Sequence, residues 1–270
     1  MPTKPLTPCA APGCPAVSKG RFCDKHTKQY WREVSARQKP PEQRGYNEKW
    51  KAARAAFLLA HPYCAECRIS GSNIPATDVD HFIPHRGNEL LFWSVENWQS
   101  LCRYHHRGKT IRDDMPDKVN AVYPLGLRPS AIPLTIVHGP SGSGKTTWVR
   151  QQTIEGDMVI DVDEIMASLA GQPMYWASGT KWLRTALLKR NERLLSLADA
   201  TTGKAWFIVS APIRAEQWYW TKMLQPERVV VMNTPLDVCV GRLRADTRRQ
   251  LTAEKYVRLA EQWWKTWVTR

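Results

Sequence analysis

Residues 134–146 have the sequence LTIVHGPSGSGKT, in which a largely apolar run leads into a glycine-rich loop. From Gly139 to Thr146 the loop matches the phosphate-binding pattern G-x-x-x-x-G-K-[ST] in full, between an expected strand and an expected helix. Glycines let backbone amides face a phosphate group at the N-terminus of the helix that follows. The stretch therefore predicts a nucleotide-binding loop at the start of an α/β domain.

Strands and helices alternate on the C-terminal side of this loop. We predict strands at 134–138, 158–162, 205–210 and 228–232, and helices at 145–153, 181–199, 215–224, 237–248 and 252–268. This alternation favours a parallel sheet covered by helices, so we expect a three-layer α/β domain over residues 133–270. Trp263, Trp264 and Trp267 share one face of the last helix, and we expect that face to be core or a subunit contact rather than a base-stacking surface.

The glycine-rich loop also defines an expected site for ATP and magnesium. Lys145 should reach the β- and γ-phosphates, and the hydroxyl of Thr146 should bind Mg2+. The residues expected to contact ATP are Gly139, Ser141, Gly142, Ser143, Gly144, Lys145, Thr146, Thr147 and Arg242.

Charged residues after the second and fourth strands predict a phosphoryl-transfer site. Asp163 suits a base that takes the proton of an acceptor hydroxyl, and Asp161 is the competing candidate. Arginines after the fourth strand can neutralise a transferring phosphoryl group. This layout resembles the small P-loop kinases that include the 5′-polynucleotide kinases of phages. The resemblance implies that Asp163 is the general base, that Arg242 is a helix-borne arginine and that Arg248 or Arg249 belongs to a lid.

Two positions depart from that family. Met166 stands where a basic residue is expected one turn after the aspartate, and Ala211 replaces an acid expected just past the third strand. Arg214 could supply a phosphate contact near the second of these positions.

Six of the seven cysteines lie before residue 103, each close to another cysteine or a histidine. Disulfides are rare in a reducing cytosol, whereas Cys and His at short spacings suit zinc. Two groups of four residues therefore predict two structural Zn2+ sites. The expected ligands are Cys9, Cys14, Cys23 and His26 in the first group, and Cys64, Cys67, Cys102 and His105 in the second.

Asp80, His81, Asn97 and His106 lie within and beside the second group. With the flanking Cys-x-x-Cys pair, their spacing resembles the HNH, or ββα-metal, endonucleases of bacteriophages over about 50 residues, 60–112. The resemblance implies that Asp80 and His106 hold a divalent ion, Mg2+ or Mn2+, and that Asn97 orients His81. An imidazole titrates close to neutral pH, which suits His81 as the base that deprotonates the attacking water. His85 could be an added ligand or an ordinary hairpin histidine.

The length of the chain allows two domains, and the two resemblances imply a multidomain α+β and α/β protein, in which a zinc-stabilised ββα-metal nuclease is followed by a three-layer α/β kinase domain. We expect a zinc knuckle and helix at 1–40, a nuclease domain at 41–115, a proline-rich linker at 116–132 and the kinase-type domain at 133–270. The net charge is +14, with +8 up to residue 130 and +6 beyond it. Both parts are basic, which predicts a nucleic-acid partner, with DNA expected and RNA the alternative.

No apolar run approaches the ~18 residues of a membrane span, and the N-terminus lacks the apolar segment of a signal peptide. We therefore expect a cytoplasmic protein, in the host cytoplasm if a phage encodes it. The motifs together predict a bifunctional enzyme: a metal-dependent HNH endonuclease joined to an ATP-dependent polynucleotide 5′-hydroxyl kinase. One alternative is a nuclease that is gated or positioned by ATP hydrolysis. Another is a zinc-knuckle nucleic-acid binder with a decayed nuclease site, against which the complete set of HNH residues argues.

Overall fold

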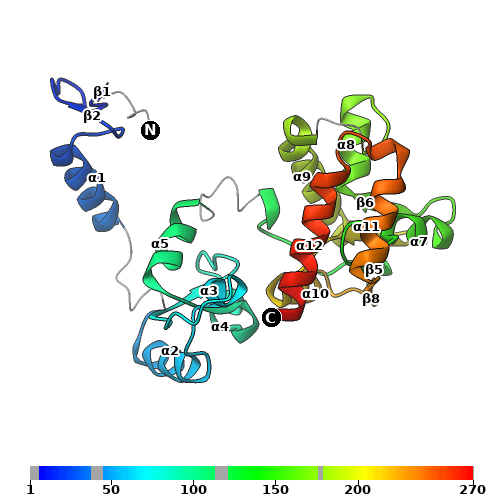
Figure 1. Ribbon diagram of the computed structural model, residues 1–270, viewed down its shortest axis with the longest axis horizontal. Coiled ribbons are helices and arrows are strands. Elements are labelled where there is room, and N and C mark those ends of the chain that lie inside the picture. Colours follow the sequence, from blue (N-terminus) through cyan, green and yellow to red (C-terminus); the bar gives the residue numbers. More distant parts are fainter. Residues whose placement is uncertain (1–5, 38–44, 113–120, 176–178, 270) are drawn as a thin grey trace. The chain divides into compact units, whose positions relative to one another are not determined.

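The computed structural model describes residues 6–37, 45–112, 121–175 and 179–269 (Figure 1). The chain divides into two compact units, unit 1 (residues 1–55) and unit 2 (residues 56–270). The described residues contain no helix with the length and apolar character that crossing a bilayer would require.

Unit 1 is a small hairpin followed by helices. Strands β1 (Thr7–Pro8) and β2 (Val17–Ser18) pair antiparallel, and α1 (Asp24–Arg37) follows them. Helix α2 (Glu48–Ala60) begins after Asn47, whose side-chain oxygen accepts from the N–H of Trp50 at 3.1 Å. An asparagine that satisfies a free amide in this way is a common helix start. The helix predicted within residues 1–40 is confirmed as α1.

The first part of unit 2 is a hairpin and a helix with short elements between them. The elements are α3 (Ala65–Ile69), β3 (Asp78–His81), α4 (Glu89–Trp93), the 3-10 turn η2 (Val95–Asn97), β4 (Trp98–Leu101) and α5 (Arg103–Arg112). Strands β3 and β4 pair antiparallel, with Asp80 opposite Gln99 and His81 opposite Trp98. Successive residues of a strand point to opposite faces, so Asp80 and His81 face different sides of the hairpin.

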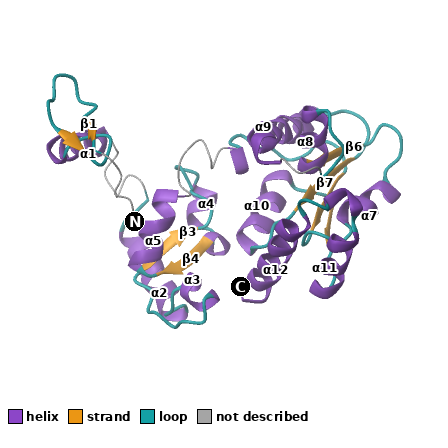
Figure 2. Ribbon diagram, turned by 45° about the horizontal axis from the view of Figure 1, so that its top comes forward, coloured by secondary structure: helices purple, strands orange, loops and turns teal. Residues whose placement is uncertain are grey.

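The rest of unit 2 is built on a four-stranded parallel sheet. Its strands are β5 (Leu134–His138), β6 (Met158–Asp161), β7 (Ala205–Val209) and β8 (Arg228–Val231), in the spatial order β6-β7-β5-β8. Helices surround this sheet (Figure 2): α7 (Lys145–Gln152), α8 (Val162–Ala170), α9 (Gly179–Ser196), α10 (Arg214–Leu224), α11 (Leu236–Ala245) and α12 (Ala253–Thr269). Two 3-10 turns, η3 (Leu197–Asp199) and η4 (Thr247–Arg249), complete it. The predicted parallel α/β domain is confirmed.

The strands bury both faces of the sheet. Leu134 and Ile136 of β5 lie in one apolar cluster with residues of α9 and α10, whereas Val137 lies in another with residues of α7. Phe207 and its neighbour Trp206 divide between the same two clusters. A parallel sheet covered on both faces has this pattern, and it places helices on either side of the phosphate-binding loop.

Two local predictions in this domain are wrong. No helix was predicted at 162–170, where the structure has α8. This helix begins there because Asp161 ends β6 and the side chain of Asp161 accepts from the N–H of Asp163 at 2.9 Å. The helix predicted to continue to residue 248 ends at Ala245 instead. Asp246 leaves the helical conformation and its carboxylate accepts from the N–H of Arg248 at 3.1 Å, which starts the tighter turn η4.

The tryptophan-rich face of α12 packs into the core. Trp263 is 1% exposed, and its indole N–H donates to the carbonyl of Ser210 at 2.8 Å. Its ring stacks on Trp267 with 4.9 Å between centroids. Trp263 thus holds α12 against the sheet, as expected for a core residue.

Candidate functional site

The loop between β5 and α7 requires glycine at two positions because it lies against neighbouring backbone. A Cβ atom on Gly142 would lie 2.7 Å from the carbonyl oxygen of Cys239, and Gly142 has a φ of +79°. A Cβ atom on Gly139 would overlap the carbonyl of Met232. The loop therefore packs closely against the residue that follows β8 and against α11. These contacts constrain the backbone conformation of the loop.

We expect Gly142→Ala to lower ATP affinity by at least about tenfold, a loss of ~1.4 kcal/mol. The new methyl group must displace the backbone of α11 at Cys239, and the loop amides would move with it. Gly156→Ala is the matched control, since Gly156 also has a positive φ, +92°, but has open space around its Cβ position. Calorimetric titration with ATP measures both variants. Equal affinity of Gly142→Ala and the wild type would contradict this account of the loop.

Lys145 lies at the start of α7 with its ammonium group turned onto the loop. Its Nζ donates to the carbonyls of Gly139 and Pro140, each at 2.7 Å. Burial lowers the pKa of Lys145 to about 8, although the carboxylates of Asp161 and Asp163 oppose that shift. A buried ammonium gains by meeting an anion, so this position fits a phosphate group. The buried hydroxyl of Ser143, which has no hydrogen-bond partner among the described residues, is a further polar group in the same loop.

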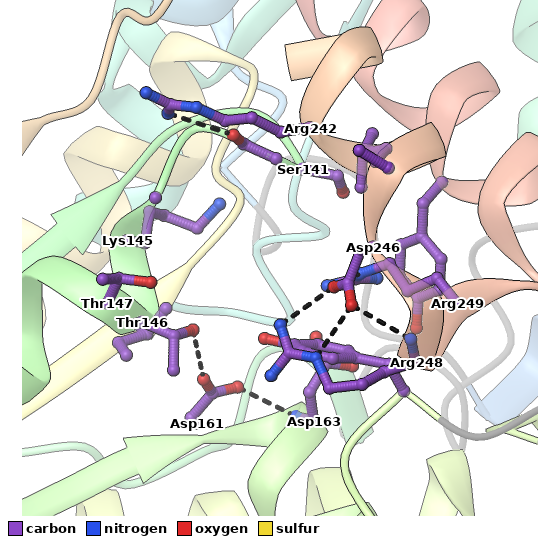
Figure 3. Close-up of a pocket in the computed structure, with 17 residues that line it drawn as sticks. Ser141, Lys145, Thr146, Thr147, Asp161, Asp163, Arg242, Asp246, Arg248 and Arg249 are labelled. Carbon is purple, nitrogen blue, oxygen red and sulfur yellow. Dashed lines mark hydrogen bonds and ion pairs between the residues drawn. The ribbon is translucent and has the colours of Figure 1, made fainter. Parts of the chain in front are cut away.

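Thr146 and Asp161 bring two oxygen atoms together beside the loop (Figure 3). The Thr146 hydroxyl donates to Asp161 Oδ2 at 3.0 Å, while Asp161 Oδ1 caps α8. Burial raises the pKa of Asp161, which is 5% exposed. Hard oxygen ligands of this kind suit Mg2+, which commonly takes only one or two protein ligands together with substrate phosphates. The pair therefore fits a magnesium ion.

Asp163 lies on the wall of the same cavity, which has a volume of about 480 Å³. Burial raises the pKa of Asp163 to about 6, and the neighbouring carboxylate of Asp161 adds to the increase. The charges of Arg249 and Lys145 act in the opposite direction. At neutral pH the group is ionised and more basic than an ordinary aspartate. Such a carboxylate can accept a proton from a hydroxyl group placed in the cavity.

Three arginines approach the cavity from α11 and the turn after it. Arg242 donates to the carbonyl of Ser143 at 3.2 Å and so reaches the loop itself. Arg248 makes two hydrogen bonds to the carboxylate of Asp246, at 2.8 and 2.9 Å, and remains exposed. The third arginine is Arg249, and all three guanidinium groups are cations that can contact phosphate oxygens.

Arg249 also donates to Asp246, through its Nε at 3.2 Å, and in addition lies between two tyrosine rings. Its guanidinium lies 3.4 Å from the ring centre of Tyr175 and 4.2 Å from that of Tyr256. The residue is 7% exposed, and its Nη1 has no hydrogen-bond partner among the described residues. A buried donor without a partner is costly unless a ligand supplies an acceptor. Because Arg249 lines the cavity, phosphate oxygens bound there fit this donor.

The cavity brings most of the predicted ATP-site residues together, and it adds residues that were not predicted. Gly139 and Ser143 of the loop do not line it, whereas Ser141, Gly142, Gly144, Lys145, Thr146, Thr147 and Arg242 do. Tyr175, Asp246 and Tyr256 were missed. Asp246 could have been suspected from its place among the arginines, but no motif marks the two tyrosines.

The first Cys/His group assembles in unit 1. Cys9, Cys14, Cys23 and His26 place their ligand atoms within 4.8 Å of one another. His26 Nδ1 lies 3.4 Å from Cys9 Sγ and 3.3 Å from Cys23 Sγ. The hairpin supplies the first two cysteines, and the first turn of α1 supplies the histidine. Three thiolates and one imidazole at this spacing fit tetrahedral zinc.

The second group assembles in unit 2, where α3 meets the start of α5. Cys64, Cys67, Cys102 and His105 also place their ligand atoms within 4.8 Å of one another. His105 Nδ1 lies 3.3 or 3.4 Å from each of the three sulfur atoms. Both groups can hold zinc, and the second ties β4 and α5 to the segment that precedes the hairpin.

We expect about two zinc ions per chain to remain after treatment with a chelator that removes exchangeable magnesium, because each closed tetrahedral site binds zinc tightly. Cys67→Ser should remove close to one equivalent. Cys239→Ser is the matched control, because Cys239 is buried between α11 and α12 and belongs to neither group. Elemental analysis measures each protein. Folded wild-type protein without zinc would contradict both sites.

The hairpin β3–β4 and helix α5 hold the remaining predicted residues. Asp80 accepts from the side-chain amide of Gln99 and pairs with Lys109, both at 3.1 Å. Lys109 and His106 are three residues apart on α5, so they share the helix face that meets Asp80. The ion pair places α5, the helix that also carries His106, against Asp80 of β3.

His81 is oriented by the backbone carbonyl of Phe92. Its Nε2 donates to that oxygen at 2.9 Å, so the basic nitrogen of the neutral ring is Nδ1. The ring packs against His85, with 5.0 Å between centroids. His81 is 5% exposed in this arrangement.

The side chain of Asn97 makes hydrogen bonds to backbone groups between β3 and β4. Its side chain accepts from the N–H of Ile83 and donates to the carbonyls of Ile83 and Leu91, all at 2.9 Å. These bonds close the segment between β3 and β4 into a loop. Leu91 precedes Phe92, the acceptor of His81, so the hydrogen bonds of Asn97 hold the backbone next to the carbonyl that His81 contacts.

Comparison with known proteins bears on the C-terminal part of the chain. A family model for the AAA domain matches residues 134–269, which is half of the chain. A search of curated proteins found no match. Among solved structures the chain is similar to shikimate kinase from Acinetobacter baumannii in complex with shikimate, with 18% identity and a TM-score of 0.35. That similarity covers 56% of this chain and 79% of the kinase chain.

The family match covers the sheet, the phosphate-binding loop and the arginine-bearing helix described above. With the loop, the parallel sheet and the match in agreement, the chain belongs to the AAA-domain family, and residues 134–269 form a nucleotide-binding P-loop domain of the kinase type.

Proposed function

We propose that the P-loop domain transfers the γ-phosphoryl group of ATP to a 5′-hydroxyl end of a nucleic acid. The observation that carries this proposal is the position of Asp163, a basic carboxylate on the wall of the cavity that Lys145 and Thr146 also line. A carboxylate of raised pKa in this position is suited to taking the proton of a hydroxyl group that attacks the γ-phosphate.

In this mechanism the polar groups of the cavity bind the phosphates, hold the magnesium ion, take the proton of the acceptor and stabilise the transferring group. The loop amides and Lys145 bind the phosphates, and Lys145 exchanges its bonds to the loop carbonyls for phosphate oxygens. Mg2+, held by Thr146 and Asp161, would neutralise charge on the β- and γ-phosphates. Asp163 takes the proton of the attacking hydroxyl, and Arg249 stabilises negative charge on the transferring group.

We propose further that the hairpin β3–β4 and helix α5 form a metal-dependent nuclease site for phosphodiesters. The tautomer of His81 supports this, because a neutral ring whose Nε2 donates to Phe92 has its basic lone pair on Nδ1. Asp80 and His106 would hold a divalent cation, and a carboxylate with an imidazole suits Mg2+ or Mn2+. Such an ion stabilises the charge that develops on the phosphate and on the leaving oxygen. Lys109, now paired with Asp80, would be released to contact phosphate.

A 5′-kinase acts only on ends that carry a 5′-hydroxyl group. Hydrolysis that displaces O5′ leaves such an end with a 3′-phosphate opposite it, whereas hydrolysis that displaces O3′ leaves a 5′-phosphate. The kinase would therefore act on the product of the nuclease where O5′ is the leaving atom, and otherwise on 5′-hydroxyl ends from another source. The boundaries proposed for the parts are those expected from composition, with the linker at 116–132.

ADP formation with matched oligonucleotides tests the kinase proposal. We expect an oligonucleotide with a 5′-hydroxyl to raise ADP release, and the same oligonucleotide with a 5′-phosphate to leave it at the basal rate. Equal stimulation by both would favour ATP hydrolysis that gates or positions cutting, and would contradict transfer to ends. Plasmid nicking with Mg2+ or Mn2+, and without ATP, tests the nuclease proposal separately.

A further inference from the structure

Unit 1 carries more than half of the chain's net positive charge. Its 55 residues include 12 Lys and Arg against four Asp and Glu, so they hold +8 of the net +14. Residues 56–130 contain eight basic and eight acidic residues and are neutral. A fifth of the chain thus holds more than half of its net charge. Such a concentration is the electrostatic signature of a surface that binds a polyanion.

Part of this charge lies in one row along α1. Lys25, Lys28 and Arg32 are exposed and line a single surface hollow together with Gln29 and Glu33. Positions i, i+3 and i+7 lie on one face of a helix and here span about 10 Å along its axis. Glu33 is the one acid in the lining, and Gln29 donates to it at 3.0 Å. The face is therefore cationic at three successive points.

The first Cys/His group fixes the helix that carries this row. His26, whose Nδ1 lies 3.4 Å from Cys9 Sγ and 3.3 Å from Cys23 Sγ, belongs to the first turn of α1. Lys25 and Lys28 flank it in the sequence. Metal at this group would hold the N-terminal end of α1 in one place, and a basic face that is already ordered binds at a smaller entropic cost.

We propose that unit 1 binds duplex DNA through this face of α1, by contact with backbone phosphates and without sequence preference. Charge complementarity selects a polyanion, and the placement of the cations on one face of an α-helix favours a DNA duplex over an RNA duplex. The major groove of B-form DNA is ~12 Å wide and admits an α-helix, whereas the corresponding groove of A-form RNA is too narrow. The surface adds affinity for DNA to the chain and depends on neither of the two catalytic activities.

Fluorescence anisotropy with a labelled 30-base-pair DNA duplex tests this proposal in buffer without divalent cations, where no cutting or phosphoryl transfer takes place. The full chain with Lys25→Gln, Lys28→Gln and Arg32→Gln should bind at least tenfold more weakly than the wild type. The slope of log K against log salt should become shallower by about 2–3, because each lost phosphate contact removes ~0.9 from it. A duplex RNA of the same length should bind more weakly than the DNA.

The matched control is Lys49→Gln, Lys51→Gln and Arg54→Gln, which removes the same charge from α2 of unit 1. It should keep most of the affinity and the slope. A charge-conserving variant with Lys25→Arg, Lys28→Arg and Arg32→Lys should bind DNA like the wild type. This result separates loss of phosphate contacts from loss of folding. The zinc content should be equal in all variants. Unchanged affinity in the α1 variant, equal weakening in the α2 variant, or tighter binding of RNA would each overturn the proposal.

Discussion

Asp163→Asn should reduce phosphoryl transfer by about 10²–10⁴-fold, the usual contribution of a positioned general base, while ATP affinity stays close to that of the wild type. The amide keeps the size and position of the carboxylate but cannot take a proton from the acceptor. We expect the loop amides and Lys145 to hold ATP. The substitution changes none of these groups, and its effect on Lys145 is limited to removing one of two carboxylates that favour the charged ammonium. Transfer rates at saturating ATP, with ATP affinity measured by calorimetry, separate the two effects.

Two further variants make this result specific. Glu164→Gln is the matched control, since Glu164 is the next acid along α8 but is exposed and does not line the cavity. It should transfer phosphate at the wild-type rate. Lys145→Ala should weaken ATP binding and transfer together, because its charge meets phosphate in the ground state and the transition state alike.

Asp161 is the competing base, and its contacts predict a different phenotype. It is bound to the Thr146 hydroxyl and to the backbone of α8, so Asp161→Asn should change the dependence on magnesium and reduce stability. If Asp163→Asn transferred phosphate efficiently and Asp161→Asn did not at any magnesium concentration, the two roles would have to be exchanged.

His81→Ala should abolish metal-dependent nicking by a comparable factor of about 10²–10⁴, because it removes the base that deprotonates the attacking water. Folding, zinc content and ATP binding should be unchanged, since the ring is not a ligand of the Cys/His group. Conversion of supercoiled plasmid to open circles measures the activity.

His61→Ala is the matched control for this variant, because His61 follows α2, is exposed and stacks on Phe57 at 4.4 Å. It should nick at the wild-type rate. His85→Ala determines whether the histidine that packs on His81 takes part, since a purely structural role would leave the metal requirement unaltered. Undiminished nicking by His81→Ala would remove His81 from the mechanism.

Most elements of the P-loop domain could be predicted because they have strong local signals. Strand β5 is an apolar run that a glycine motif terminates, and the other three strands have similar runs between helical segments. Helix α8 gave no comparable signal. Asp161 both ends the strand and caps the helix, and a cap is difficult to distinguish from a catalytic acid when only the sequence is known.

The motif residues of the two sites were predicted, whereas the residues that support them were not. Tyr175 and Tyr256 clamp Arg249 although they are 81 positions apart in the chain, and only the folded structure brings them together. Asn97 is a similar case, because its position was predicted but its hydrogen bonds to Ile83 and Leu91 were not. Motifs identify groups that react with ligands, but the contacts that orient these groups depend on long-range packing.

The central claim is that the cavity of the P-loop domain transfers phosphate to nucleic-acid ends. The most direct measurement is incubation of the wild-type chain with ATP labelled in its γ-phosphate and a 5′-hydroxyl oligonucleotide, followed by analysis of the labelled position. The account predicts label on the 5′ end of DNA or RNA, and none when the end already carries phosphate. Release of all the label as inorganic phosphate, with no labelled DNA or RNA, would contradict it.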